Sequence, residues 1–524
     1  MSASTEKKQR QAAREAGTDK KTLAEQEAAK KKAKSNRRWT LGTIGVILLI
    51  ALILFLNSSF LYTHTTAISV GDSNYSPAEV SYVYANRYYN WIQSYGSYAS
   101  IFGLDTSTGI AGLKQQECPM YDDGRTWHDY FMEEARSELS QMTALCAWAD
   151  ANGVTLTDEE IAEVDDSIAT LDSSARAGGY ASGDKYFSAN YGTGVTSAIV
   201  REMALKSALA NKASSEYAAS LEYTDAELEE HYQSLDGAQD KFAFSYYLVN
   251  AEKVESTDAD GNTSSAVTEE TTAAAKDAAD DILTAYTALK QSNPDDDNYT
   301  AMLNSAVAQV APTAEATERS NITGGNLGDY KEWLMASGRK AGDATVVDKA
   351  DGSGSYVVVF LDRSDNHYPV AQVRHILIKA VADSDGSYTD KAKEIAKNRA
   401  EEILAEFNAG DKTEDSFAEL AKDYSEDTGS AENGGLYDTV YKGATVEEFD
   451  KFCFEGHKKG DTAIVYGESS SYAGYHVMYY VGEGDLYSNL LAKNDLVNTT
   501  VSQWVEDQVN ALTVTNGWWL RIAG

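Results

Sequence analysis

The chain has 524 residues, enough for several domains at about 150 residues each. An apolar content of 43%, with 10% aromatic residues, excludes a largely disordered protein. The net charge of −36 argues against a nucleic-acid partner, and three cysteines (Cys118, Cys146 and Cys453) are too few for a disulfide scaffold or a zinc knuckle.

The N-terminal residues predict a membrane anchor. Residues 1–38 carry 12 basic and 5 acidic residues, and no formal charge follows until Asp72. The uncharged span 39–62 has 24 residues, more than the ~20 that a helix needs to cross a bilayer. We therefore predict a basic cytoplasmic tail at 1–38, a transmembrane signal-anchor helix at 39–62, and an extracytoplasmic remainder of net charge −43. The alternative is a cleavable signal peptide, which the long basic region and the lack of a clear A-x-A site disfavour.

Residues 63–239 predict a helical domain. Capping boxes mark three helix starts, at Ser76-x-x-Glu79, Thr157-x-x-Glu160 and Thr224-x-x-Glu227. The aromatic run at 82–98 serves either helix packing or a substrate-facing surface. With GVTLTDEEI and YTDAELEEHYQS in this order, the segment resembles the N-terminal helical chaperone domain of SurA-type and trigger-factor-type foldases.

From residue 240 onward, a pattern of strands and helices occurs twice. The first copy, at 240–369, runs from FAFSYYLVN through a long acidic loop (255–270) and a helix to GSYVVVFL. The second copy, at 370–485, runs from QVRHILIKA through two helices to GYHVMYYV. The pattern A-x-x-I-L-x-x-(aromatic)-x-A occurs at Ala279 and again at Ala400. These features indicate an internal duplication of a small α+β domain.

The second copy is similar to the parvulin-type peptidyl-prolyl isomerases. The resemblance rests on VRHILIK, FAELAKDYSED, the Gly-Gly turn at 434–435, EEFDKFCF and GYHV. It implies a facing pair of histidines, His375 and His476, with Asp427 where the family has Cys or Asp. It further implies a substrate pocket lined by Phe449, Phe454, Leu436 and Thr445.

These residue types suit rotation about an X–Pro bond. The barrier of ~18–20 kcal/mol is crossed without breaking a bond, so neither a nucleophile nor a metal or other cofactor is required. An apolar pocket and polar groups that favour the twisted amide suffice, and two imidazoles can fix each other's tautomer beside a carboxylate. A general-base role for Asp427 is less favoured. A metal site at His375, His457 and His476 is disfavoured, because no ligand spacing such as H-E-x-x-H occurs.

The second copy departs from the family pattern at three places. Its turn reads GGLYD at 434–438, where many relatives have G-G-x-L-G. Thr445 stands where the family usually has an apolar residue, often Met, and we predict that it caps the following helix together with Glu448. The loop at 381–387 is acidic rather than basic, which predicts that phosphorylated substrates are not preferred.

The first copy lacks both histidines. Tyr246 aligns with His375 and Tyr356 with His476, whereas a G-G-x-L-G turn is kept at 324–328. We interpret this copy as a scaffold or a peptide-binding module.

The sequence thus predicts a multidomain α+β fold with two parvulin-like domains, the first degenerate, and a C-terminal helix within 486–524 that packs back on the helical domain. Trp518 and Trp519 are expected to be packing residues. The expected function is that of a membrane-tethered, extracytoplasmic peptidyl-prolyl isomerase and foldase for unfolded secreted polypeptides, with no nucleic acid, metal or cofactor. A non-catalytic holdase chaperone is the alternative. Resemblance to PrsA-type foldases implies a Gram-positive-type cell.

Overall fold

The computed structural model describes residues 3–17, 20–56, 58–257 and 263–524. The chain divides into two compact units, which are residues 1–221 with 499–524 (unit 1) and residues 222–498 (unit 2). Two predictions fall partly outside the described residues. Asn57 belongs to the predicted transmembrane span, and residues 258–262 belong to the predicted acidic loop.

The chain begins with three helices, α1 (Ala3–Glu15), α2 (Lys20–Leu56) and α3 (Phe60–His64). Over the described parts of the chain, none of the helices combines the length and the apolar character that a membrane crossing requires. The predicted transmembrane helix at 39–62 therefore has no support from the structure.

Unit 1 combines a helical core with a small antiparallel sheet of order β13-β1-β2. Its strands are β1 (Ile68–Val70), β2 (Ser73–Tyr75) and β13 (Val514–Asn516). Its further helices are α4 (Pro77–Tyr95), α5 (Trp127–Asn152), α6 (Asp158–Ala177), α7 (Gly183–Asn190) and α8 (Ser197–Ala219). Because β13 pairs with β1, the C-terminal residues return to the helical part of the chain.

The three predicted capping boxes are confirmed. Ser76, Thr157 and Thr224 each accept a bond from the backbone N–H three residues on, and the Glu there bonds back to the cap N–H. The aromatic run at 82–98 mostly packs inside unit 1, although Tyr95 and Tyr98 at its end are exposed.

The packing role expected of Trp518 is wrong. Trp518 is 70% exposed, and the guanidinium of Arg521 lies over its ring. The residue starts a short 3-10 helix near the end of the chain, where the aromatic sequence alone does not show which side faces the core.

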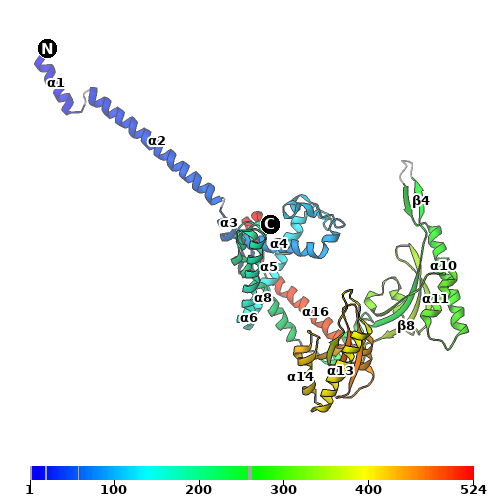
Figure 1. The fold of residues 1–524 in the computed structure, drawn as a ribbon. Helices are drawn as coiled ribbons and strands as arrows, with labels where there is room; N and C mark the ends of the chain where they lie inside the picture. The colour runs from blue at the N-terminus through cyan, green and yellow to red at the C-terminus, as the bar shows by residue number, and fades with distance from the viewer. Residues whose placement is uncertain (1–2, 18–19, 57, 258–262) are drawn as a thin grey trace. The chain divides into compact units, whose positions relative to one another are not determined.

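Unit 2 contains two four-stranded antiparallel sheets, of which the first is green to yellow-green and the second yellow-green to orange in Figure 1. The first sheet, β6-β3-β8-β7, consists of β3 (Lys241–Asn250), β6 (Thr317–Thr323), β7 (Ala344–Asp348) and β8 (Gly354–Ser364), with helices α10 (Glu269–Ser292), α11 (Tyr299–Val310) and α12 (Lys331–Met335). The second sheet, β10-β9-β12-β11, consists of β9 (Pro369–Lys379), β10 (Leu436–Val440), β11 (Thr462–Glu468) and β12 (Ala473–Leu486), with helices α13 (Asp390–Ala409), α14 (Glu414–Tyr424) and α15 (Glu447–Phe454).

The two sheets repeat the same register, as expected from the internal duplication. Tyr246 pairs with Val358 in the first sheet, as His375 pairs with Met478 in the second. Tyr356 likewise pairs with Leu248, as His476 pairs with Leu377. The helix pattern matches as well, because Ala279, Ile282 and Tyr286 of α10 and Ala400, Ile403 and Phe407 of α13 are all buried.

Two expectations for the first copy are corrected. Its Gly-Gly pair at 324–325 follows the edge strand β6, whereas the pair at 434–435 precedes the edge strand β10, so the two turns are not counterparts. The predicted acidic loop is partly a hairpin of β4 (Val254–Thr257) and β5 (Thr263–Ala266). The Val, Thr and Ser residues that flank its acidic centre are well suited to strand pairing.

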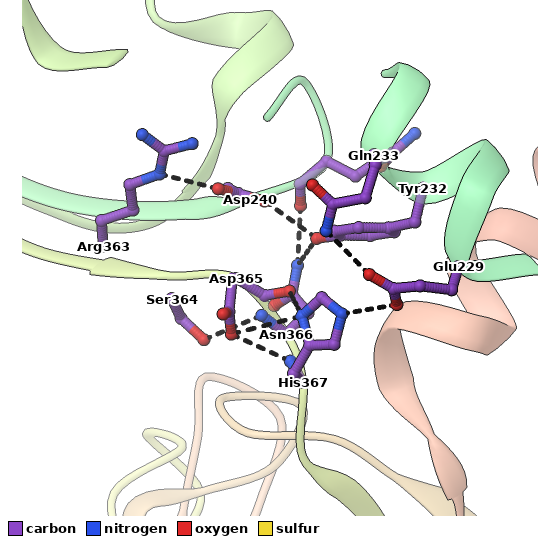
Figure 2. Close-up of polar contacts among 10 residues, drawn as sticks. Glu229, Tyr232, Gln233, Asp240, Arg363, Ser364, Asp365, Asn366 and His367 are labelled. Carbon is purple, nitrogen blue, oxygen red and sulfur yellow. Dashed lines mark hydrogen bonds and ion pairs between the residues drawn. The ribbon is translucent and has the colours of Figure 1, made fainter. Parts of the chain in front are cut away.

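A polar network joins the two sheets of unit 2 through α9 (Asp225–Ser234) and the linker between β8 and β9 (Figure 2). Asp240 accepts hydrogen bonds from Arg363 Nε at 2.7 Å and from the Tyr232 hydroxyl at 3.0 Å. Asn366 Nδ2 lies 2.9 Å from that hydroxyl, and His367 Nε2 lies 2.8 Å from Glu229 Oε2. These bonds hold the linker residues just before β9, the first strand of the second sheet, against α9. The helix α16 (Tyr487–Asn510), which follows β12, packs Ala492 against Leu228 and Tyr232 of α9.

Candidate active site

The two central strands of the second sheet place the predicted histidines face to face. His375 on β9 and His476 on β12 occupy diagonal positions of one face, because His375 pairs with Met478, two residues beyond His476. Their Nδ1 atoms lie 3.1 Å apart, and the residues are 2% and 4% exposed. Helices α13 and α14 pack on the opposite face of the sheet, where Ile376 and Val477 point.

Asp427 reaches the pair from the loop after α14. That loop is held against β9 by bonds from Glu426 N to the Leu377 carbonyl at 2.9 Å and from Leu377 N to Ser425 Oγ at 3.2 Å. Asp427 Oδ2 then lies 3.1 Å from His375 Nε2. The glycines at 434–435 close the loop onto the sheet. Both have positive φ, and a Cβ at Gly435 would lie 2.2 Å from the His375 carbonyl oxygen.

The carboxylate of Asp427 is the charged end of this network. The hydrogen bond from His375 is the main cause that lowers its pKa below the ordinary value, and the hydroxyls of Ser430 and Tyr437 add to it. Ser430 Oγ donates to Oδ2 at 2.6 Å and the Tyr437 hydroxyl at 3.1 Å. The side chain of Asp427 is 21% exposed. It is therefore an ionised group that solvent, and hence a ligand, can reach.

The hydrogen bonds that run from Tyr472 through the two imidazoles to Asp427 can all form with one assignment of donors and acceptors. The Tyr472 hydroxyl lies 3.0 Å from His476 Nε2, and it can donate to that nitrogen. His476 Nδ1–H then donates to His375 Nδ1, and His375 Nε2–H donates to Asp427. Both imidazoles are neutral in this arrangement. Burial, followed by the neighbouring His375, lowers the pKa of His476 to about 3, in agreement with a neutral ring.

The four predicted pocket residues do not all lie at this network. The Phe449 ring contacts both imidazoles edge-on, with centroids 5.4 Å from His375 and 5.2 Å from His476. Phe454 instead packs on Tyr368 and Lys442.

Two further predictions need correction, the pocket position of Leu436 and the capping role of Thr445, whereas the pocket role of Thr445 stays a prediction. Leu436 pairs with Arg374, so it projects from the face opposite to the imidazoles, and Tyr437 occupies the near face with its ring centroid 4.6 Å from that of His375. Thr445 does not cap α15 with Glu448, because the helix starts one residue later than a Thr445 cap requires, with Val446 at the cap position.

Three groups of the network were not predicted, namely Ser430, Tyr437 and Tyr472. Ser430 follows Asp427 by three residues. At this spacing a serine hydroxyl can reach a carboxylate within one turn of the chain, so this contact could be predicted from the sequence. Tyr472 and His476 lie on either side of the start of β12. Gly467 on β11 leaves room for both, because a Cβ there would lie 2.8 Å from His476 Nε2 and 3.0 Å from the Tyr472 hydroxyl.

His457 does not join the pair. It stacks on Phe452 with centroids 4.3 Å apart and lies 3.4 Å from Asp461. Within the described residues, no group of three or more His, Cys, Asp or Glu side chains is arranged to hold a metal ion.

The family match covers this site. Residues 357–480 match the family described as the PPIC-type PPIASE domain. The match begins in β8 of the first sheet and includes His375, Asp427 and His476. This part of the chain is a parvulin-type domain. The parvulin domain thus carries a complete pair of imidazoles, and the first sheet repeats its register without them.

Curated relatives of the chain are foldases by name. Foldase protein PrsA 3 of Bacillus anthracis is 29% identical over 159 residues, which are 29% of this chain and 48% of that protein. Foldase protein PrsA of Staphylococcus aureus (strain Newman) is 36% identical over 139 residues, 26% of this chain and 40% of that protein. The chain thus spans about half, or less, of the length of these relatives.

Solved structures of similar proteins include several of PrsA. The crystal structure of the peptidylprolyl isomerase PrsA from Bacillus anthracis has 24% identity and a TM-score of 0.18, over 28% of this chain and 59% of that chain. The crystal structure of PrsA from Bacillus subtilis has 15% identity and a TM-score of 0.28, over 74% of this chain and 88% of that chain.

Proposed function

We propose that the chain is a peptidyl-prolyl cis–trans isomerase and foldase that acts on unfolded secreted polypeptides. The observation that carries the proposal is the buried line of hydrogen bonds from Tyr472 through the two imidazoles to Asp427, which ends on a partly exposed carboxylate. The parvulin-type domain and the foldase names of the relatives support it.

The Asp427 carboxylate supplies the electrostatic part of the mechanism. A planar amide carries partial negative charge on oxygen and partial positive charge on nitrogen through resonance, and rotation through the barrier removes both. An ionised carboxylate held beside the substrate carbonyl oxygen repels that negative charge, and so favours the twisted amide over the planar one. Because Asp427 stays ionised, this interaction is present throughout the neutral pH range.

The imidazoles act as positioning residues in this mechanism. They are almost fully buried, so they reach the substrate through Asp427 rather than by direct contact. A neutral His476 donates to His375, which leaves the Nε2–H of His375 to orient the carboxylate. The buried Phe449 supports both rings from one side. Fixed dipoles of this kind need no reorganisation when the amide twists.

The test uses the full chain and a short peptide with one X–Pro bond in a protease-coupled isomerisation assay. We expect Asp427→Asn, which keeps shape and removes charge, to lower kcat/KM on the order of 10²-fold or more. The matched control is Glu432→Gln, which removes an exposed carboxylate of the same region and leaves kcat/KM unchanged. Equal activity of Asp427→Asn and the parent chain would refute the electrostatic mechanism, and an inactive parent chain would refute the isomerase function.

A holdase chaperone without catalysis is the second candidate. It is favoured by one observation, the tyrosines that replace both histidines in the first sheet. If the chain is only a holdase, it suppresses aggregation of a reduced, unfolded client equally well with and without the Asp427→Asn change. The isomerase proposal expects refolding of a proline-limited client to slow in the same variant.

The proposal includes a tether to the outer face of the cell membrane through residues 39–62. Its support is the sequence, in which an uncharged span follows a basic segment. Protease added to intact cells should then remove unit 2 and spare a short N-terminal fragment. Protection of the whole chain until lysis would contradict the tether and the extracytoplasmic location.

A further inference from the structure

The first sheet carries a cluster of three tyrosines where the parvulin domain has its imidazoles and Phe449. Tyr246 on β3 and Tyr356 on β8 occupy the register positions of His375 and His476. Their rings meet edge to face, with centroids 5.8 Å apart and planes at 74°. Tyr330, at the end of the one-turn helix η5 (Gly328–Tyr330), completes what we call the tyrosine cluster.

Tyr330 stands in the position of Phe449. Its ring contacts both members of the tyrosine pair, 5.8 Å from Tyr246 and 5.4 Å from Tyr356, and the plane of Tyr356 is at 87° to it. Phe449 contacts its two imidazoles at similar distances, 5.4 and 5.2 Å, but edge-on to both, whereas the planes of Tyr330 and Tyr246 are at 31°. The first sheet therefore keeps the three-ring arrangement of the candidate active site and replaces the two imidazoles with phenols.

The tyrosine cluster is half-buried, unlike the imidazole pair. All three rings have intermediate exposure, whereas His375 and His476 are buried. Among the described residues, none makes a hydrogen bond to the three hydroxyls, and none of these hydroxyl oxygens is buried. Burial of the rings raises the pKa of Tyr330 and of Tyr356, so both hydroxyls remain donors at neutral pH. The cluster thus offers aromatic faces together with free donors.

We propose that the tyrosine cluster is a non-catalytic binding site for an extended, proline-bearing segment of an unfolded polypeptide. Aromatic rings pack well on the rigid pyrrolidine ring, and hydroxyl donors meet the carbonyls that a proline-containing chain leaves without partners. The choice of ligand rests on the proposed function, whereas the site itself rests on the geometry of the first sheet.

The charges around the cluster favour a neutral segment over a basic one. Asp329 and Lys349 both act on Tyr356, in opposite directions. Lys349 Nζ is held by Asp351 at 2.9 Å and Ser353 at 2.7 Å, and Asp329 accepts from Ala350 N at 3.3 Å. Asp351 also acts on Tyr356, and Arg319 acts on Tyr330, so two charges of each sign lie near the rings and the cluster is not an anionic cage for a lysine or an arginine.

Binding is measured with the full chain carrying Asp427→Asn and Phe449→Ala, which silences the parvulin site. The probe is a short, neutral, fluorescent peptide with one Leu–Pro step, and its partner has Ala in place of Pro. We expect the proline peptide to bind more tightly, and Tyr330→Ala to weaken its binding about tenfold. Tyr330→Phe, which keeps the ring, should weaken it less. Trp518→Ala, which removes an exposed aromatic ring of unit 1, is the control and should have no effect.

Photo-cross-linking locates the bound peptide directly, and it does not depend on whether Tyr330→Ala unfolds the domain. The same peptide with a photoreactive leucine beside the proline should cross-link to β3, β8 or residues 328–335. Cross-links confined to 370–485 or to unit 1 would overturn the proposal, as would equal binding of the two peptides or tighter binding of a lysine-bearing one. Because neither readout uses turnover, a failure of the isomerase proposal is seen separately.

Discussion

Burial sets the protonation of His476 and therefore gives the fold a dependence on pH. The pKa of His476 is lowered to about 3 in the folded chain, against about 6.5 when unfolded. Between these pKa values the unfolded state binds more protons than the folded state, so the free energy of unfolding rises with pH. The contribution of His476 reaches its full value above about pH 6.5. The lowered pKa of Asp427 acts in the same direction at more acidic pH.

We therefore expect the stability of unit 2 to fall as the pH is lowered from about 6.5 to 5, by on the order of 1 kcal/mol per pH unit from His476. Urea unfolding followed at both pH values measures the change. His476→Asn should remove most of it. An equal pH dependence in the parent chain and the variant would show that His476 is not held neutral by burial.

Gly467 makes room for the last hydrogen bond of the network. An added methyl group would lie 2.8 Å from His476 Nε2, 2.9 Å from Val446 Cγ2 and 3.0 Å from the Tyr472 hydroxyl. We expect Gly467→Ala to displace Tyr472 or the imidazole and to lower kcat/KM about tenfold with the fold retained. Gly410→Ala is the control, because its methyl group would meet only ordinary contacts, the nearest at 3.6 Å. Unchanged activity in Gly467→Ala would mean that this bond does not matter.

At the residue scale, the sequence motifs located His375, Asp427 and His476 but not the hydroxyls around them. The motif residues stand next to recognisable strand and loop patterns. Tyr437 and Tyr472 reach the network only because the edge strand β10 and the hairpin before β12 fold onto it, and such contacts have no local period. Leu436 was misplaced because strand register decides the face, and one residue of register exchanges the two faces.

At the scale of elements, the loop between β9 and α13 carries acidic charge and follows the strand that bears His375. Asp383 N bonds to the Ser387 carbonyl at 2.8 Å, and the bond from Ser387 N lowers the pKa of Asp385. Because the loop is anionic, we expect no gain in kcat/KM for a phosphoserine before proline over a glutamate or an alanine. A peptide series assayed at low salt tests this expectation. A clear preference for the phosphorylated member would contradict it.

The buried Asp240 anchors the junction between α9 and the two sheets (Figure 2). It is 3% exposed and binds Arg363 and the Tyr232 hydroxyl. We expect Asp240→Asn to destabilise unit 2 by on the order of 1 kcal/mol, since it leaves the partly exposed guanidinium with a neutral partner. Thermal unfolding measures the loss. Asp362→Asn changes an exposed neighbour and should be neutral, and equal effects of the two changes would contradict a specific role for the ion pair.

The same scale shows why central strands are easier to predict than edge strands. The strands β3, β8, β9 and β12 are long, have buried apolar residues and were found from the sequence. The edge strand β6 is TERSNIT, mostly exposed and polar, and its pairing depends on β3 rather than on its own pattern. The Gly-Gly pair after β6 was therefore mistaken for the turn that precedes β10.

At the scale of the whole molecule, the chain order does not follow the units. Residues 499–524 belong to unit 1 because the three-residue strand β13 pairs with β1, more than 400 positions earlier in the chain. The amphipathic pattern predicts a returning helix, and Trp504 near the end of α16 stacks on Tyr217 and meets Trp148 in unit 1, whereas a strand as short as β13 has no detectable period. The duplication within unit 2 was accessible from sequence because both helices repeat the same buried positions.

Isomerisation is expected to depend on one network that the second sheet has and the first sheet lacks. The most direct test is the isomerisation rate of the full chain with His375→Asn, His476→Asn and both changes, each checked for folding by circular dichroism. We predict that each single change lowers kcat/KM on the order of 10²-fold and that the double change costs little more, because both residues act through the same carboxylate. A folded double variant with the activity of the parent chain would contradict the account.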